Sequence, residues 1–468
     1  MPTIVFALAL IAPAAGVPVA HGGDETRGNL QAEIDALRGE IDELRDRRLE
    51  DDIDADRMQE IRALVSDVMA DAGRRTTFQD DVAIPGWKKG FQLRSPDGNF
   101  LLKVGGQVQI RFVLNHANGL SSAEPNPPAG KGAPYQWGLE NRRTKLAFQG
   151  HVVDPGWTYK VKGAFTREIR GINLLEEAWI ARSLGDGWKI RVGQFKPPWM
   201  REELVSSSRQ LAVDRSVVNG YFKQGYSQGV ELAWSSDDFR IIGWTGDGIG
   251  PRNLGRARAN GQNTPWNKTA TSYSFTGRTE WRLAGDWKQF KDFNSRRGSE
   301  FAAMVGVSGA IQRANQNLGP ASGTVAGGVT GDVTLAFDGG SIFVSGVWTS
   351  VTAPKADGGG TNNPFGFTVQ GGYFVGEDVE VIGRFAYMNY DLENQVDPKV
   401  GRFDGLTVGA NWFINPAVKF ALDWTINFDS LATPGLTGSF VSNSAGFRPD
   451  QPGAVNQWAL RGQLQLLF

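Results

Sequence analysis

Long segments of the chain after residue 90 alternate apolar and polar side chains one by one. In the segment 98–114, Leu102 and Val104 point to one side of a strand while Lys103 points to the other. Ordinary strands have about 5–6 residues, whereas a tilted strand needs about 9–11 to cross a bilayer. The pattern therefore predicts membrane-crossing β-strands with one face toward lipid and one toward water.

Sixteen such strands are predicted, joined by short turns and long polar loops in alternation, which is typical of outer-membrane barrels. They are 98–114, 141–153, 157–166, 174–183, 188–195, 225–235, 238–246, 271–285, 299–314, 324–338, 341–353, 364–375, 379–390, 402–414, 417–429 and 455–468. The connection 286–298 is long where a short turn is due. The predicted fold class is all-β: a 16-stranded antiparallel transmembrane β-barrel over 90–468, wide enough for an aqueous channel.

A different pattern precedes the barrel. Within the charged stretch 24–75, apolar residues recur at alternating spacings of four and three, which predicts an N-terminal α-helical coiled coil. The seam is Leu30, Ile34, Leu37, Ile41 and Leu44. An even strand count puts this stem in the periplasm; the alternative is one amphipathic helix packed on its own barrel. Residues 1–20 are apolar and rich in Ala, which predicts a signal peptide, with a buried helix as the alternative.

Composition excludes several classes of protein. The chain has no Cys, so disulfide frameworks and Cys-based metal or redox sites are excluded. No run of 18 apolar residues occurs, which excludes a helical membrane protein. The net charge of −1 hides an asymmetry, because residues 24–81 hold 9 basic and 18 acidic residues while residues 82–468 hold 40 and 32. A basic barrel follows an acidic stem.

The basic residues of the first five predicted strands fall on the polar face. If the apolar residues face lipid, this face lines the lumen, and inward acids such as Glu380 and Asp423 are fewer. A positively lined constriction attracts anions. The alternative is that scattered cations only solvate the wall. The candidate pore-lining residues on these strands are Arg143, Lys145, Lys160, Lys162 and Arg191.

The connection 196–224 is too rich in anchoring residues for a flexible external loop. It mixes Pro, aromatic residues and both signs of charge: Lys196 and Arg201 are candidate pore-lining, anion-attracting residues, and Glu202 and Glu203 are candidate eyelet acids. We expect it to fold back into the lumen as an eyelet that narrows the channel. An eyelet needs opposed charges to fix its own shape, so several of these charges are expected to pair with each other.

Several segments resemble the phosphate-selective porins O and P over about 90–468. The first is Gly193-Gln194-Phe195-Lys196-Pro197-Pro198, which is followed by Glu202-Glu203, the Ser run and Asp214-Arg215. The other three are Arg142-Arg143, residues 409–419 and the terminal strand. The resemblance implies sixteen strands, a homo-trimer and an eyelet loop. It also implies that the C-terminal aromatic Phe468 is the signal read by the barrel-assembly machinery.

The resemblance carries over only part of an anion site. Arg142 and Arg143 match the paired arginines that border the family's phosphate site, whereas Glu203 stands where phosphate-selective members have a lysine. A carboxylate at the constriction repels phosphate. We therefore predict an outer-membrane porin for passive diffusion of small hydrophilic solutes and ions, with a mild anion preference. The alternatives are a phosphate- or polyphosphate-selective channel and an envelope tether that uses the coiled coil.

No enzyme is predicted. The histidines outside the N-terminal segment, His116 and His151, lie in no nucleophile or metal-binding motif, and Gly358–Gly360 is followed by no helix. We therefore expect no catalytic residue, metal, cofactor or nucleic-acid partner. The expected partners are outer-membrane lipid, the assembly machinery, further copies of the chain and small ions.

Overall fold

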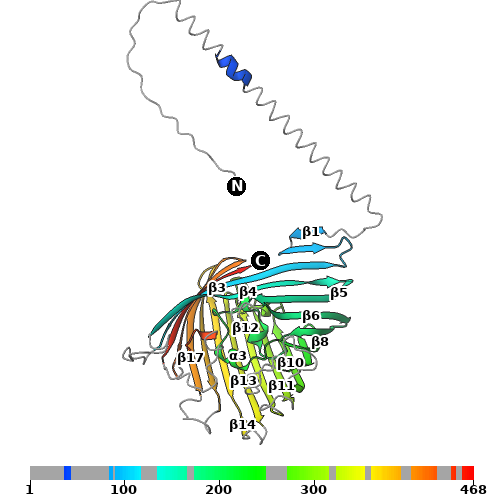
Figure 1. Cartoon of the computed structure of the whole chain (residues 1–468), viewed down its shortest axis with the longest axis vertical. Coiled ribbons are helices and arrows are strands. Elements are labelled where there is room, and N and C mark those ends of the chain that lie inside the picture. Colours follow the sequence, from blue (N-terminus) through cyan, green and yellow to red (C-terminus); the bar gives the residue numbers. More distant parts are fainter. Residues whose placement is uncertain are drawn as a thin grey trace, which may run out of the picture. The chain divides into compact units, whose positions relative to one another are not determined.

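Sixteen long antiparallel strands dominate the computed structural model (Figure 1). The structure describes residues 36–43, 84–87, 90–117, 134–165, 173–248, 271–315, 323–353, 360–391, 402–429, 444–448 and 456–468. The strands are β3 (Leu101–His116), β4 (Tyr135–Val152), β5 (Asp154–Phe165), β6 (Asn173–Gly185), β7 (Trp188–Phe195), β8 (Ser227–Ser235), β9 (Phe239–Gly246), β10 (Thr271–Ala284), β11 (Ala302–Ala314), β12 (Val325–Phe337), β13 (Gly340–Ala353), β15 (Phe365–Phe374), β16 (Val379–Asn389), β17 (Arg402–Asn415), β18 (Val418–Asn427) and β19 (Trp458–Leu467). They confirm the sixteen predicted strands.

The sheet closes on itself. Each long strand pairs with the next one along the chain, and β19 pairs with β3, where Leu460 lies opposite Leu114. Closure matters because it removes the open edge strands that would otherwise pair with other chains. The predicted antiparallel β-barrel is therefore confirmed.

The strand β12 shows how the wall separates lipid from lumen. Val329 and Val333 are 54% and 38% exposed, whereas Thr330 and Asp332 between them are 3% and 4% exposed. Apolar side chains thus cover the outside and polar side chains the inside, the reverse of a soluble protein. Such a surface is stable only against hydrocarbon, and the polar backbone groups are satisfied within the closed sheet.

Three short strands and one strand start differ from the prediction. β1 (Ile84–Trp87) and β2 (Phe91–Arg94) form a hairpin that pairs with β3, and β14 (Gly360–Asn362) pairs with the end of β13. β4 begins at Tyr135 rather than 141, because Tyr135 pairs with His116 and continues the ladder into the predicted loop. These extensions are too short, or too close to loop composition, for periodicity to reveal.

The two ends of the barrel differ in their connections, which allows them to be named. At the turn end, β6 and β7 are joined at Gly185, Asp186 and Gly187, all with positive φ. This backbone suits Gly and Asp and matches the twist of the paired strands. The opposite end, where most predicted long loops fall outside the described residues, is the loop end.

The N-terminal part forms a separate unit, Met1–Asp81. In it, residues 36–43 are helical. The rest of the predicted coiled coil over 24–75 and the predicted signal peptide over 1–20 lie outside the described residues. In the part of the chain that is described, no helix is long and apolar enough to cross a membrane.

Two connections fold into the barrel. The first, residues 196–224, carries α2 (Arg201–Leu204), η1 (Ser207–Arg209) and α3 (Val217–Phe222), and is called the eyelet loop below. The second, residues 286–298 at the turn end, carries η4 (Gln289–Lys291) and is called the turn-end insert. Their apolar side chains form buried clusters with the inner wall.

Candidate functional site

The eyelet loop crosses the lumen and is held by hydrogen bonds from strands far apart in the ring. The carbonyl oxygen of Trp199 accepts from Ser308 on β11 at 2.9 Å. Further along the loop, the Leu211 carbonyl accepts from Asn411 on β17 at 2.7 Å. The Val213 amide donates to Asp423 on β18 at 3.0 Å. These contacts hold the loop against the inner face of the wall, and any solute must pass beside it.

Glu202 and Glu203 hold the eyelet loop together. The Glu202 carboxylate accepts from the Ser216 amide at 2.7 Å and from its hydroxyl at 2.6 Å. Glu203 pairs with Lys196 at 3.1 Å and with Arg215 at 3.4 Å. Burial alone would raise the pKa of the Glu203 carboxyl, but Arg215 and Lys196 outweigh burial and lower that pKa to about 2. Glu203 is thus an internal tie of the loop, whereas Glu202 also joins the loop to the wall, because its carboxylate lies 3.5 Å from Arg384 on β16.

This pairing predicts acid-sensitive channel noise. Because the pKa of Glu203 is lowered from 4.5 to about 2, its contribution to the loop is complete above pH 4.5 and is lost as the pH falls toward 2. Single-channel current recorded at decreasing pH should stay quiet above pH 4.5 and become noisy below it. The variant Glu203→Gln, which cannot ionise, should be noisy at neutral pH already. A quiet variant would contradict this role.

Asp214 in the same loop meets three arginines of the wall. Its carboxylate lies 2.8 Å from Arg142 Nε, 2.7 Å from Arg143 Nη2 and 3.3 Å from Arg111 Nη1. Arg142 and Arg143 share one face, although they are neighbours, because β4 has a bulge opposite Gln109. Burial alone would raise the pKa of the Asp214 carboxyl, but the guanidinium groups hold that pKa well below its usual range.

Three lysines of β4 and β5 pair with two carboxylates of β6. Lys145 lies 2.6 Å from Glu176, Lys160 lies 2.9 Å from Glu177, and Lys162 contacts both acids. Glu176 and Glu177 both face inward because β6 has a register shift opposite Lys162 and Gly163. Strict alternation puts only one of the two in the lumen, so the sequence reasoning missed the pair.

The remaining predicted cations also have acidic neighbours. Arg191 on β7 lies 2.6 Å from Glu231 on β8, and Arg201 in α2 lies 3.8 Å from Glu280 on β10. Glu231 stands between Val230 and Leu232, so alternation along β8 was a sufficient signal for it. With Lys196 bound to Glu203, each of the eight predicted pore-lining cations has a carboxylate within 4 Å.

The turn-end insert contacts the eyelet loop from the turn end of the barrel. The Phe293 amide donates to the Arg209 carbonyl at 3.3 Å, and the Phe293 ring lies 4.7 Å from that of Phe343. Arg201 donates to the Phe290 carbonyl. The unusual length of this connection, visible in the sequence, is thus used to fill the lumen under the loop.

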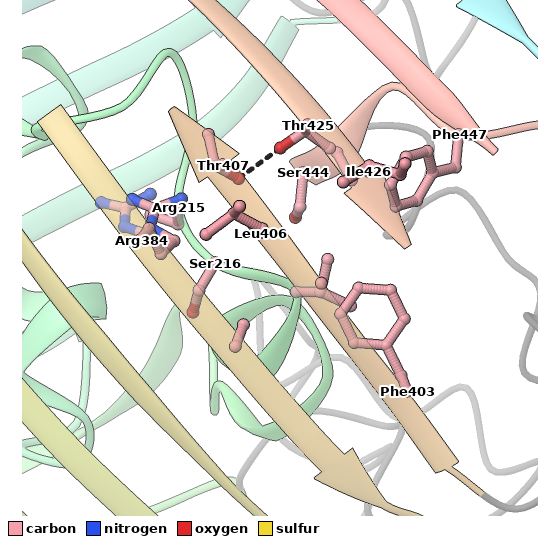
Figure 2. Close-up of a pocket in the computed structure, with 14 residues that line it drawn as sticks. Arg215, Ser216, Arg384, Phe403, Leu406, Thr407, Thr425, Ile426, Ser444 and Phe447 are labelled. Atoms are coloured by element: carbon pink, nitrogen blue, oxygen red, sulfur yellow. Dashed lines mark hydrogen bonds between the residues drawn. The ribbon is translucent and has the colours of Figure 1, made fainter. Parts of the chain in front are cut away.

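A small pocket lies between the eyelet loop and the wall formed by β16, β17 and β18 (Figure 2). Arg215 and Arg384 line one end of it, and Phe403 and Phe447, whose ring centroids are 6.3 Å apart, line the other. Arg215 Nε donates to the Glu202 carbonyl at 2.8 Å, so its charge also faces the backbone of the loop. The pocket combines guanidinium groups with apolar walls.

Phe468 closes the sheet at the turn end. Its amide donates to the Gly106 carbonyl at 3.2 Å, and its carbonyl accepts from the Gly106 amide at 2.8 Å. His116 lies in an aromatic group with Tyr135 and Trp458, and His151 Nε2 lies 2.8 Å from the Gly98 carbonyl. Among the described residues, no group of three or more His, Cys, Asp or Glu is placed to hold a metal ion.

Comparisons with known proteins agree with this architecture. The anion-selective porin from Comamonas acidovorans matches with a TM-score of 0.50 and 13% identity, covering 78% of this chain and 99% of that one. The outer membrane channel DcaP of Acinetobacter baumannii matches with a TM-score of 0.52 and 10% identity, covering 81% and 99%. At these identities, the likeness shows the fold alone. No curated protein sequence matches the chain.

A family model gives the more specific result. Residues 132–244 match the model described as phosphate-selective porin O and P, and this segment holds the eyelet loop and both paired arginines. The fold is that of outer-membrane channels. Over residues 132–244 the chain is therefore similar to the phosphate-selective porins O and P.

Proposed function

We propose that this porin passes small hydrophilic solutes and ions by passive diffusion, with a mild preference for anions. One observation carries the proposal: eight inward cations share six carboxylates, so the wall is nearly neutralised but keeps a small positive excess. The cations are Arg142, Arg143, Lys145, Lys160, Lys162, Arg191, Lys196 and Arg201, and their partners are Asp214, Glu176, Glu177, Glu231, Glu203 and Glu280. A weak excess gives weak field focusing.

The same pairing argues against a dedicated phosphate channel. Arg142 and Arg143, the arginines that the family resemblance associates with phosphate, already contact the carboxylate of Asp214. Glu203 adds a second carboxylate within the eyelet loop. An incoming phosphate would have to displace Asp214 and approach Glu203, which costs electrostatic energy.

The setting of the channel is part of the proposal. We propose a homo-trimer in outer-membrane lipid, with residues 24–75 as a periplasmic stem after removal of residues 1–20. Phe468 ends the last strand and is proposed as the signal that the barrel-assembly machinery reads. In the closed barrel the backbone of Phe468 pairs with Gly106, so the terminal residue is unpaired only before closure, which suits a signal read during assembly.

Single-channel recording of the purified full chain in a potassium chloride gradient tests the proposal. We expect ion conduction with a small reversal potential of the sign given by chloride selectivity. A cation-selective reversal potential would contradict the assignment of the basic excess to the pore. Absence of conductance would contradict the channel function itself.

Removal of wall carboxylates should strengthen the anion preference. In the double variant Glu176→Gln and Glu177→Gln, the amides keep hydrogen-bonding capacity while three lysines lose their counter-charges. We expect the chloride-to-potassium permeability ratio to rise about tenfold. This is the low end of the enrichment of counter-ions that a cleft lined by one sign of charge produces. Asp154→Asn is the control, because Asp154 pairs with Arg182 at the partly exposed turn end. An equal effect in both variants would show that the β6 acids do not set selectivity.

A further inference from the structure

The carboxylate of Asp214 is held as a bound oxyanion would be held. One of its oxygens accepts from Arg143 Nη2 at 2.7 Å and from the Arg215 amide at 2.9 Å. The other accepts from Arg142 Nε at 2.8 Å and from Arg111 Nη1 at 3.3 Å. Four N–H donors, three of them on guanidinium groups, therefore converge on two oxygens. Guanidinium groups are the side chains best suited to bind carboxylate and phosphate in this way.

The arginines are positioned by the wall as well as by Asp214. Arg111 Nε donates to Glu140 Oε1 at 2.7 Å, and Arg143 Nη1 donates to Gln109 Oε1 at 2.9 Å. Gln109, Arg111, Glu140 and Arg143 all belong to the paired strands β3 and β4. The donors thus come from the rigid sheet, whereas the anion that they hold comes from the eyelet loop.

We propose that Asp214 is a built-in anion that occupies an oxyanion site of the wall and thereby keeps external phosphate and similar oxyanions from binding there. This inference rests on the proposed channel function and deepens it, because it names the residue that makes selectivity mild. The side chains of Arg142 and Arg143 are 15% and 10% exposed, whereas that of Asp214 is 4% exposed. The guanidinium donors are therefore more accessible to a solute than the carboxylate that they hold. Without that carboxylate, the site is complete for a small oxyanion.

The direct test uses Asp214→Asn and inorganic phosphate as a blocker of the chloride current. The amide has the size of the carboxylate but no charge, so the loop keeps its shape while the arginines lose their anion. We expect phosphate to block the variant saturably, with a half-blocking concentration about tenfold lower than in the unmodified channel, which is the effect of one charged hydrogen-bonding partner. In the double variant Asp214→Asn and Arg142→Gln, this block should disappear.

A matched control separates the site from net charge. Glu231→Gln removes one negative charge from the same lumen, where Glu231 pairs with Arg191 alone among the wall cations discussed above. It should shift the reversal potential without producing a saturable phosphate block. Equal phosphate block in Glu231→Gln and Asp214→Asn would overturn the proposal, because charge alone would explain it. A conducting Asp214→Asn channel with unchanged phosphate sensitivity would overturn it too, and would leave the channel function standing.

A refolding measurement covers the case in which the variant does not assemble. Asp214→Ala leaves a gap where the carboxylate stood, and an external oxyanion that fills the gap stabilises the folded state by binding. Refolding of this variant into detergent should give a higher yield in phosphate than in chloride of equal ionic strength. The gain in phosphate should exceed that of the unmodified chain, whose yield phosphate raises only through its general salt effect. A gain for the variant no larger than that of the unmodified chain would count against a phosphate-binding site.

Discussion

Arg278→Met is expected to lower the free energy of unfolding by about 3–5 kcal/mol, the cost of leaving a buried charge without its partner. Arg278 on β10 and Asp332 on β12 have side chains that are 0% exposed, with N–O distances of 2.8 and 3.0 Å. Arg278 also donates to Glu280 at 2.9 Å and to the Trp199 carbonyl at 3.3 Å. Met matches much of its volume but none of its charge, so Asp332 is stranded next to the eyelet loop.

The measurement is the temperature at which the barrel loses its compact form in detergent, followed together with urea unfolding. Arg402→Met is the control, because Arg402 pairs with Asp429 at 2.5 Å but its side chain is 57% exposed. An exposed pair contributes about 0–1 kcal/mol. If Arg278→Met lowers the free energy of unfolding by no more than the control does, water must reach the Asp332 carboxylate.

The strands were predictable because their signal is local and long. Alternation over ten or more residues fixes both the strand and the face that meets lipid, as at Val329 and Val333 in β12. β14, with three residues, carries no such signal. The start of β4 at Tyr135 depends on pairing with His116, which is a contact distant in sequence. Such contacts are set by the register of the closed sheet.

For the charged site, the cations were predictable from the sequence, but two of the carboxylates that pair with them were not. Alternation gave the correct inward face for Lys145, Lys160 and Lys162, but it overlooked that Glu176 and Glu177 share that face. A bulge shifts the alternation by one residue, and on β6 itself the residues at the shift, Leu175–Ala178, include no Gly or Pro that would mark it. A count of inward charge from periodicity alone therefore overestimates the positive field wherever bulges occur.

The eyelet loop was predictable as an inward fold but not in its contacts. Its mixture of Pro, aromatic and charged residues excluded an ordinary external loop, yet nothing in that mixture identifies Asp214 as the partner of Arg142 and Arg143. These residues lie about 70 positions apart, and only closure of the barrel around the loop brings them together. The position of the insert at Phe293 depends on the same closure.

Trp199→Ala is expected to release the first half of the eyelet loop and to give a larger, noisier unit conductance. The Trp199 side chain is buried at 2% exposure, and its Nε1 donates to the Phe222 carbonyl at 3.0 Å, which ties the start of the loop to α3. Loss of a buried aromatic ring costs about 3–5 kcal/mol. Because the eyelet loop is not built into the sheet, this cost falls first on its attachment.

The matched control for this variant is Trp412→Ala on β17. Trp412 is 52% exposed on the outer face of the barrel, so its removal deletes the same ring without touching the eyelet loop. Unit conductance and current noise in planar bilayers should change for Trp199→Ala and stay as in the unmodified channel for Trp412→Ala. If both variants conduct like the unmodified channel, the loop does not depend on Trp199.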